Sequence, residues 1–345
     1  MNLDIPTQPS NDTQVPGGPS QTQRTPKELL VASKAYAGET RWLSWWHLWS
    51  TLTVMCVLIG TTMSGLPLVV RIIASVLAGL VTVRLFIIYH DYQHHAILQN
   101  SWIAKLVMNI YGVLVLAPTS VWQDSHNDHH KTNSQVFGDN VGSYPIMTTE
   151  DYAKAKSSER FVYAASRHPL TIAFGYLTVF MWRMCLCDFL KNPKQHLDGG
   201  LAVVIHVALL IGLGSMGLDV MLLALVVPLF VGSALGSYLF YAQHNFPEAK
   251  MAAESEWSHV DAALKASSYI PMNPVLGWFT GNIGYHHIHH LNARIPFYRL
   301  PEAMAGLEEL QTPPITTLFP KDIIACLRLK LWSEEQDRFV SFKGS

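Results

Sequence analysis

Charged residues are scarce in this chain. Of its 345 residues, 49% are hydrophobic and only 14% are Asp, Glu, Lys or Arg, whereas an ordinary soluble domain carries about 25% charged residues. The shortage indicates a membrane protein. The formal net charge of -1 provides no basic excess, which argues against nucleic acid as a partner.

Cysteine is also rare, with four residues in the whole chain. Cys56, Cys185 and Cys187 lie in apolar runs, and the four cysteines show no framework of regular spacings. We therefore expect neither disulfide bonds nor a cysteine zinc site.

The N-terminal segment, residues 1–26, has few large apolar side chains and is rich in Pro, Gln, Thr, Asn and Gly. This composition predicts a disordered tail. The segment also lacks the basic start and the apolar run of a signal peptide. We expect a membrane domain over residues 27–310 and an amphipathic C-terminal segment over residues 311–345.

Long apolar runs are present. A span needs about 20 residues, and the sequence predicts four all-α spans at residues 43–63, 68–89, 201–218 and 220–243. Very short links join the first pair and the second pair, which predicts two antiparallel hairpins. The links carry no Lys or Arg, whereas the opposite ends carry Lys27, Lys34, Arg41, Lys191, Lys194 and Lys250. The positive-inside rule then places both termini and the large loops in the cytoplasm.

Three further stretches lie outside the four predicted spans. Residues 102–117 and 170–187 are apolar but interrupted by polar side chains, and we interpret both as helices in the cytoplasmic interface, with two extra spans as the alternative. Residues 302–335 are predicted to form one or two amphipathic helices, for example over 322–332, resting on the domain or the membrane surface.

Histidine is abundant and clustered: 11 of the 16 histidines belong to three short boxes or to His244. The boxes are His90-Asp-Tyr-Gln-His94-His95, His126-Asn-Asp-His129-His130 and His286-His287-Ile-His289-His290. On a helix, residues three or four apart share a face. Each box can therefore present two or three imidazoles to one point.

The predicted topology brings these boxes together. His90 and His244 end the second and fourth spans on the cytoplasmic side, and the other two boxes lie in loops on that side. A single catalytic zinc ion needs about three protein ligands, so this number of histidines suffices for two ions. Imidazole suits Zn, Cu, Fe and Ni, and neutral ligands around two ions favour iron that cycles with dioxygen.

Other histidines are interpreted as structural. His47 and His206 are predicted to be satisfied core residues, and His168, His196 and His259 to be loop or surface residues. Arg84 is interpreted as a structural side chain whose head group reaches the membrane interface.

The three boxes resemble those of the membrane fatty acid desaturases and related hydroxylases. The segments VWQDSHNDHHKTN, YAQHNFPEA and GNIGYHHIHHLNARIPFYRL are similar to bacterial acyl-lipid desaturases, and the resemblance covers roughly residues 40–310. It implies four spanning helices below a cytoplasmic cap that holds two iron ions. The ligands it implies are His90, His94, His126, His129, His130, His244, His286, His289 and His290.

Some details stay open within this resemblance. His95 could replace His94 as a ligand, and His287 has no counterpart in the core pattern. Asp91, Asp124, Asp128 and Asn282 are candidates to receive a hydrogen bond from a ligand histidine. Trp122, Trp278, Tyr285, Gly281 and Gly284 are candidates to shape a substrate groove.

The implied reaction introduces a double bond into a fatty-acyl lipid with O2 and two electrons, with no catalytic side chain beyond the metal ligands. The sequence has no His-Pro-Gly-Gly haem motif, so a separate carrier such as ferredoxin is expected, at the bacterial inner membrane. A hydroxylase or ketolase acting on a fatty acid, alkane, carotenoid or sterol is the first alternative. A metal-binding or metal-transport membrane protein is the second.

Overall fold

The structure is a computed structural model that describes residues 24–136, 144–253 and 255–343. Most of the predicted N-terminal tail lies outside this range. The first helix, α1 (Pro26–Ser33), begins at a capping box in which Thr25 and Glu28 each bond the other's backbone. This arrangement satisfies amide groups that a helix start leaves without partners.

Among the described residues, four helical segments are long and apolar enough to cross a membrane, as predicted. They are α2 (Arg41–Thr62), α3 (Leu68–Gln93), α10 (Leu197–Met216) and the continuous run of α11 (Leu218–Met221), η3 (Leu222–Val226) and α12 (Val227–Ala242). The π-helical η3 ends two residues before Pro228, which lies in the first turn of α12. Because proline lacks an amide hydrogen, the regular hydrogen-bond ladder is interrupted there.

Helix α3 is the central span. It packs against α2 and α12, and 61% of its apolar window is buried, against 17% for α2 and 17% for α10. Two glycines permit the contact with α12: a Cβ atom on Gly79 would lie 2.6 Å from Cβ of Val231, and one on Gly232 would lie 3.1 Å from the Gly79 carbonyl oxygen. Small residues let spanning helices approach closely.

The apolar runs of residues 102–117 and 170–187 are bent or irregular. Helix α4 (Trp102–Leu114) meets α5 (Thr119–Thr132) at 89°, and α4 alone is shorter than the roughly 20 residues of a span. The other run forms α8 (Pro169–Ala173), the π-helical η2 (Tyr176–Cys187) and α9 (Asp188–Lys191). Their placement at the interface stays a prediction.

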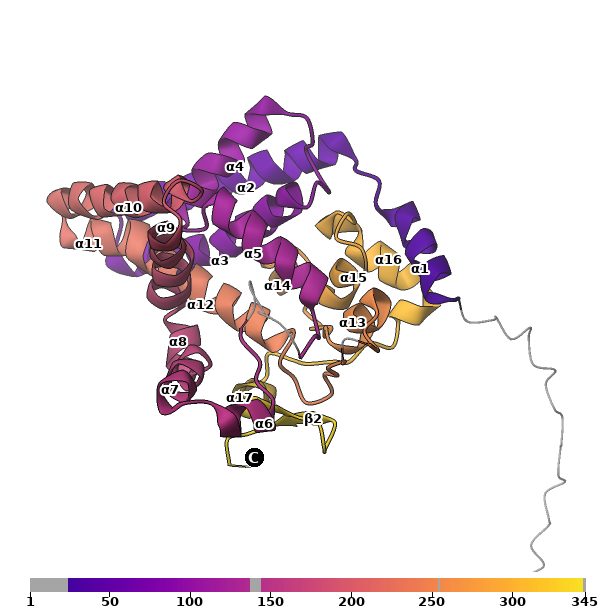
Figure 1. Ribbon diagram of the computed structural model, residues 1–345. Coiled ribbons are helices and arrows are strands. Elements are labelled where there is room, and N and C mark those ends of the chain that lie inside the picture. Colours follow the sequence, from indigo (N-terminus) through magenta and orange to yellow (C-terminus); the bar gives the residue numbers. More distant parts are fainter. Residues whose placement is uncertain (1–23, 137–143, 254, 344–345) are drawn as a thin grey trace, which may run out of the picture.

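Short helices make up the remaining part of the domain. They are η1 (Lys34–Tyr36), α6 (Thr149–Lys154), α7 (Ser157–Ser166), α13 (His259–Lys265), α14 (Pro274–Phe279), α15 (His286–Leu291), η4 (Phe297–Arg299), α16 (Leu300–Gly306) and η5 (Glu308–Leu310). Figure 1 shows α13, α15 and α16 grouped on the side of the molecule opposite the tips of α10 and α11.

The C-terminal segment differs from the expectation of helices alone. Helix α17 (Pro320–Arg328) is followed by an antiparallel pair of strands, β1 (Leu331–Ser333) and β2 (Arg338–Val340), so the helix predicted to reach residue 332 ends earlier. The reason is tertiary: Trp332 and Phe339 are both 3% exposed and pack edge to face. The Trp332 amide also donates to the Met147 carbonyl, which a helix would not permit.

Candidate metal centre

Nine histidines form two groups whose ring nitrogens lie within 4.8 Å of one another inside each group. The five-histidine group contains His90, His94, His126, His130 and His289. The four-histidine group contains His129, His244, His286 and His290. All nine side chains are buried or half-buried, and they are the same nine that the sequence predicts as ligands.

The two HxxHH boxes divide between the groups in opposite ways. On α5, His126 and His130 join the five-histidine group while His129 joins the other. On α15, His286 and His290 join the four-histidine group while His289 joins the five-histidine group. Residues four apart on a helix nearly eclipse, whereas adjacent residues diverge by about 100°. Two imidazoles of each box therefore meet at one point, as expected, while the third imidazole of each HxxHH box faces the other group.

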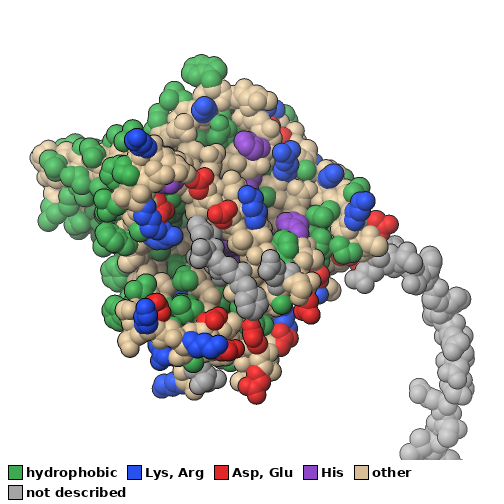
Figure 2. Space-filling model, viewed as in Figure 1, with side chains coloured by type: hydrophobic (Ala, Val, Ile, Leu, Met, Phe, Trp, Pro, Cys, Tyr) green, Lys and Arg blue, Asp and Glu red, His purple; other side chains and the backbone are tan. Residues whose placement is uncertain are grey.

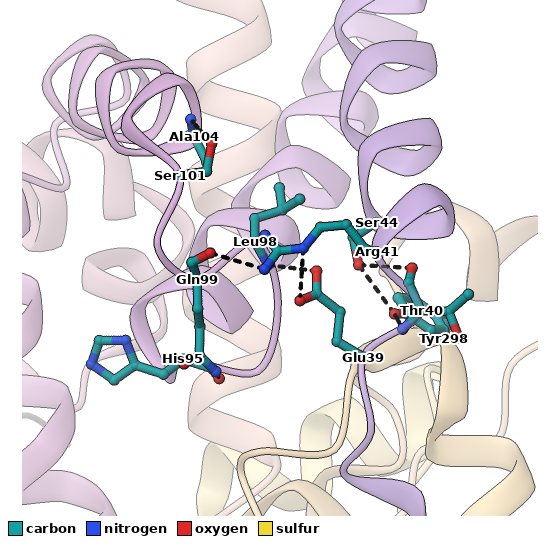
Figure 3. A network of polar contacts seen from close by, with 10 residues as sticks. All are labelled: Glu39, Thr40, Arg41, Ser44, His95, Leu98, Gln99, Ser101, Ala104 and Tyr298. Atoms are coloured by element: carbon teal, nitrogen blue, oxygen red, sulfur yellow. Dashed lines mark hydrogen bonds and ion pairs between the residues drawn. The ribbon is translucent and has the colours of Figure 1, made fainter.

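His94, and not His95, belongs to a group. The His94 and His130 ring centres lie 4.6 Å apart, whereas His95 is exposed and has a left-handed backbone with φ of 57°. The turn is held from outside, because Glu39 accepts from the Leu98 amide at 2.7 Å and Arg41 donates to the Gln99 carbonyl at 2.9 Å. Figure 3 shows the His95 ring pointing away from this network.

The four-histidine group has its Nε2 atoms in a closed ring. The successive Nε2–Nε2 distances are 3.1 Å for His129–His244, 2.8 Å for His244–His286, 3.1 Å for His286–His290 and 3.2 Å for His290–His129. In the five-histidine group, His90, His126, His130 and His289 form an open chain with steps of 3.0, 3.2 and 3.0 Å.

Hydrogen bonds alone cannot satisfy this arrangement. One imidazole nitrogen carries either a proton or a lone pair, so it cannot both donate and accept, yet every member of the ring faces two neighbours. Two ligands at right angles around a metal with bonds of about 2.1 Å would be about 3 Å apart. The observed distances between neighbouring Nε2 atoms match this value. The Nε2 positions therefore fit a metal ion in each group.

Burial keeps the imidazoles of the two groups neutral. Removal from water lowers the pKa of His244 to about 4 and holds the pKa of His126, His129 and His289 well below the usual 6.5. Neighbouring histidines lower the pKa of the last three further, because like charges repel. A neutral imidazole is the form that binds a metal.

Hydrogen-bond partners outside the two groups hold two of the nine histidine rings through their Nδ1 atoms. Nδ1 of His90 lies 3.1 Å from Oδ1 of Asp91, whose other oxygen accepts from the Phe297 amide at 2.7 Å. Nδ1 of His244 lies 3.0 Å from the Ala266 carbonyl oxygen. Asp91 is thus placed as the sequence predicted.

The other proposed outer partners contact different groups. Asp124 accepts from the Gln195 side chain at 2.6 Å, the Asp128 backbone carbonyl accepts from Thr132, and the Asn282 amide donates to the Phe297 carbonyl. His287 lies outside both groups, with its Nε2 3.1 Å from the Leu310 carbonyl oxygen.

Arg84 is buried inside the protein. The residue is only 3% exposed. Its guanidinium donates to Thr51 Oγ1 and to the Trp278 carbonyl, and it lies 3.1 Å from His47 Nδ1. Sequence reasoning missed this buried cation, although its position within an apolar span was a signal. His206 is a core residue as predicted, being 1% exposed and bonded to Tyr176. His47 is half-buried, with Nδ1 facing the Arg84 guanidinium.

A large apolar cavity of about 1250 Å³ reaches the five-histidine group. Trp122 and His126 line it, together with residues of α7, η2 and α12. Figure 2 shows hydrophobic side chains gathered on the surface over α10 and α11. Of the predicted groove residues, only Trp122 is among those lining the described cavity. Gly281 and Gly284 serve packing instead, since Cβ atoms there would meet Ile87 at 2.8 Å and the Ile270 carbonyl oxygen at 2.3 Å.

Comparison with known proteins identifies relatives over most of this chain. The sequence pattern described as fatty acid desaturase matches residues 66–318. A Bacillus subtilis protein named fatty acid desaturase is 32% identical over 269 residues, which are 77% of this chain and 76% of that protein.

More distant relatives carry related names. An Anabaena variabilis sn-1 oleoyl-lipid 12-desaturase is 23% identical over 76% of each chain. An Arabidopsis thaliana Delta(12)-fatty-acid desaturase is 24% identical over 67% of this chain and 64% of its own length. With its apolar helices and paired histidine groups, the chain belongs to the fatty acid desaturase family and is an oxidoreductase.

Proposed function

We propose that the nine clustered histidines hold two iron ions, one in each group, and that the protein desaturates fatty-acyl chains of membrane lipids. The closed ring of Nε2 atoms carries this proposal, because its spacing suits ligands around a metal and cannot be satisfied by hydrogen bonds. When bound, the two iron ions would supply the activation of O2 that removal of hydrogen from an unactivated methylene requires.

The apolar cavity is the proposed place of the acyl chain. Small-molecule pockets commonly have about 300–1,000 Å³, so 1250 Å³ accommodates a long chain. Trp122 stacks on His126 with ring centres 4.4 Å apart, and both line the cavity. The Trp122 ring can therefore position the chain beside the five-histidine group, and the apolar walls exclude water from it.

The proposed orientation places the histidine groups and both termini in the cytoplasm, with the four spans forming two hairpins in a bacterial inner membrane. The positive-inside pattern supports the orientation. An ion pair supports the hairpins: Arg71 Nη2 lies 2.6 Å from Asp219 Oδ2, which joins the start of α3 to the start of α11. The two short links then lie at one end of the bundle.

The two electrons of each turnover are proposed to come from a separate carrier such as ferredoxin. The chain carries no haem-binding His-Pro-Gly-Gly motif. Lys131 is exposed directly after the second box and is a suitable contact for an acidic carrier, since opposite charges speed the encounter of two proteins.

Expression in a host with simple lipids, followed by mass spectrometry of total fatty acids with double-bond localisation, tests the proposal. We expect new unsaturated acyl chains with the wild type and none with His129→Ala or His289→Ala, which remove one histidine from each group. Hydroxylated or ketone products would instead assign the related oxygenase activity. Ion uptake by vesicles without any oxygen-dependent product would support a transport protein.

A further inference from the structure

Asp91 is a buried carboxylate without a lysine or arginine partner among the described residues. Its residue is 2% exposed, and its one ion-pair contact in the described part of the chain is His90. An ionised carboxylate is costly to bury unless a positive group or several donors compensate it. Two donors face it instead, Nδ1 of His90 and the backbone amide of Phe297.

The two nitrogens of His90 face different partners. Nε2 lies 3.0 Å from Nε2 of His126, within the five-histidine group, and Nδ1 lies 3.1 Å from Asp91. An ionised Asp91 only accepts hydrogen bonds, so it selects the form of His90 in which Nδ1 carries the proton. The lone pair is then left on Nε2, which is the nitrogen that points into the group.

The second carboxylate oxygen is held by the backbone of a different element. It accepts from the Phe297 amide at 2.7 Å, at the start of η4. The Phe297 ring lies 5.6 Å from the Arg84 guanidinium, which itself stacks 4.2 Å from the centre of the Trp278 ring. Arg84 belongs to α3, as Asp91 does, so these contacts fix the Phe297 amide relative to the helix that carries the carboxylate.

The four-histidine group has a weaker counterpart. Nδ1 of His244 donates to a neutral carbonyl, that of Ala266, rather than to a carboxylate. Hydrogen bonds to charged acceptors are roughly twice as strong as those between neutral groups. The two groups therefore differ in the electron density that their outer contacts lend to a ligand nitrogen.

We propose that Asp91 is a positioning residue that fixes the Nδ1-protonated form of His90, so that it strengthens metal binding at the five-histidine group and not at the four-histidine group. This inference rests on the proposed metal-binding function of the histidines. Arg84, Trp278 and Phe297 support it by holding the amide that orients the carboxylate.

The test is a titration of the metal-free, full-length protein with Co²⁺, monitored by visible absorption and by metal content. Wild type is expected to bind two ions per chain. Asp91→Asn is expected to weaken one binding step by about 10–100-fold, the usual effect of losing such an outer contact, and to shift the absorption of that ion alone. Asp124→Asn, which alters an exposed acidic side chain near the second box, is the matched control and should titrate as wild type.

If the wild type shows two binding steps and Asp91→Asn leaves both unchanged or weakens both equally, the proposed role of Asp91 is overturned. The proposed function then stays intact. A wild-type protein that binds no metal would overturn both. These outcomes are therefore distinguishable from one titration.

A double-mutant cycle separates positioning from a purely structural role. If Asp91 acts through His90, Asp91→Asn in a His90→Ala background should cause no further loss of Co²⁺ affinity, since the ring it orients is gone. The neutral amide should also be tolerated there, because it relieves a carboxylate left without its partner. An equal loss of affinity or of folded protein in both backgrounds would mean that Asp91 only holds the Phe297 backbone, and would refute the proposal.

Discussion

The side chains of Arg71 and Asp219 form an ion pair between the two pairs of spanning helices, with Nη2 and Oδ2 2.6 Å apart. Arg71 also donates from Nε to the Thr62 carbonyl at 2.7 Å, so one guanidinium joins α2, α3 and α11. Arg71 is largely covered and Asp219 is exposed, so we expect a measurable but modest contribution to the stability of the bundle.

Reversal of the Asp219 charge tests this contact. Asp219→Arg is expected to lower Tm in detergent by a few degrees at most, because two cations would face each other. The double variant Arg71→Asp with Asp219→Arg should recover part of the loss, although the bond to Thr62 is not restored. Equal Tm values for wild type and Asp219→Arg would show that the pair does not stabilise the bundle.

Substitution of the neighbours His94 and His95 should have opposite results. His94→Ala removes a ring of the five-histidine group, and we expect loss of bound metal and of desaturation. His95→Asn keeps a residue that tolerates the left-handed backbone at this position and should retain both. Metal content and fatty-acid analysis check the pair, and an inactive, metal-poor His95→Asn protein would contradict the assignment of His94.

Filling the cavity should change which acyl chains are accepted. Gly236 lines the cavity, and a Cβ atom there would have open space around it. Gly236→Leu is therefore expected to fold and to reduce desaturation of the longest chains most strongly. Gly212→Leu is the matched control, since Gly212 also has open space but is not among the cavity residues. An unchanged chain-length profile for Gly236→Leu would argue against acyl binding in this cavity.

His206 should matter for stability rather than for activity. Its Nε2 bonds the Tyr176 hydroxyl between α10 and η2, and both residues are buried. His206→Ala leaves that hydroxyl without its partner, which we expect to destabilise the fold by about 1–3 kcal/mol, with turnover per folded protein unchanged. Comparison with Tyr176→Phe isolates the bond, and a His206→Ala protein that is fully stable but inactive would contradict this interpretation.

Lys330 gives the protein a pH-dependent stability. Burial and the nearby Arg167 lower the pKa of Lys330 to about 8 from 10.5. Between these values the unfolded chain binds a proton that the folded chain has released, so stability should rise with pH over this window. Tm measured from pH 7 to pH 10 should rise less for Lys330→Met than for wild type, whereas parallel curves would rule out the contribution of Lys330.

Several features could be predicted from the sequence because they depend on local composition. The four apolar spans follow from runs of residues without compensating charge, and eight of the nine histidines that gather follow from their positions in HxxxH and HxxHH patterns. His244, the ninth, follows from its place at the end of the fourth predicted span. The helix ending at Arg328 could not be predicted in the same way. Trp332 leaves the helical path because its burial against Phe339 and its backbone bond to Met147 are long-range contacts.

The division of the histidines into two groups was likewise decided by tertiary structure. Spacing alone makes His126, His129 and His130 neighbours, but it does not say that His129 faces His244 while the other two face His90 or His289. The choice between His94 and His95 depends on a left-handed turn held by Glu39 and Arg41 from outside the box. The sequence by itself therefore determined which residues can bind a metal. The packing of distant helices determined which of these residues belong to the same group, because the direction of a side chain depends on the orientation of its whole helix.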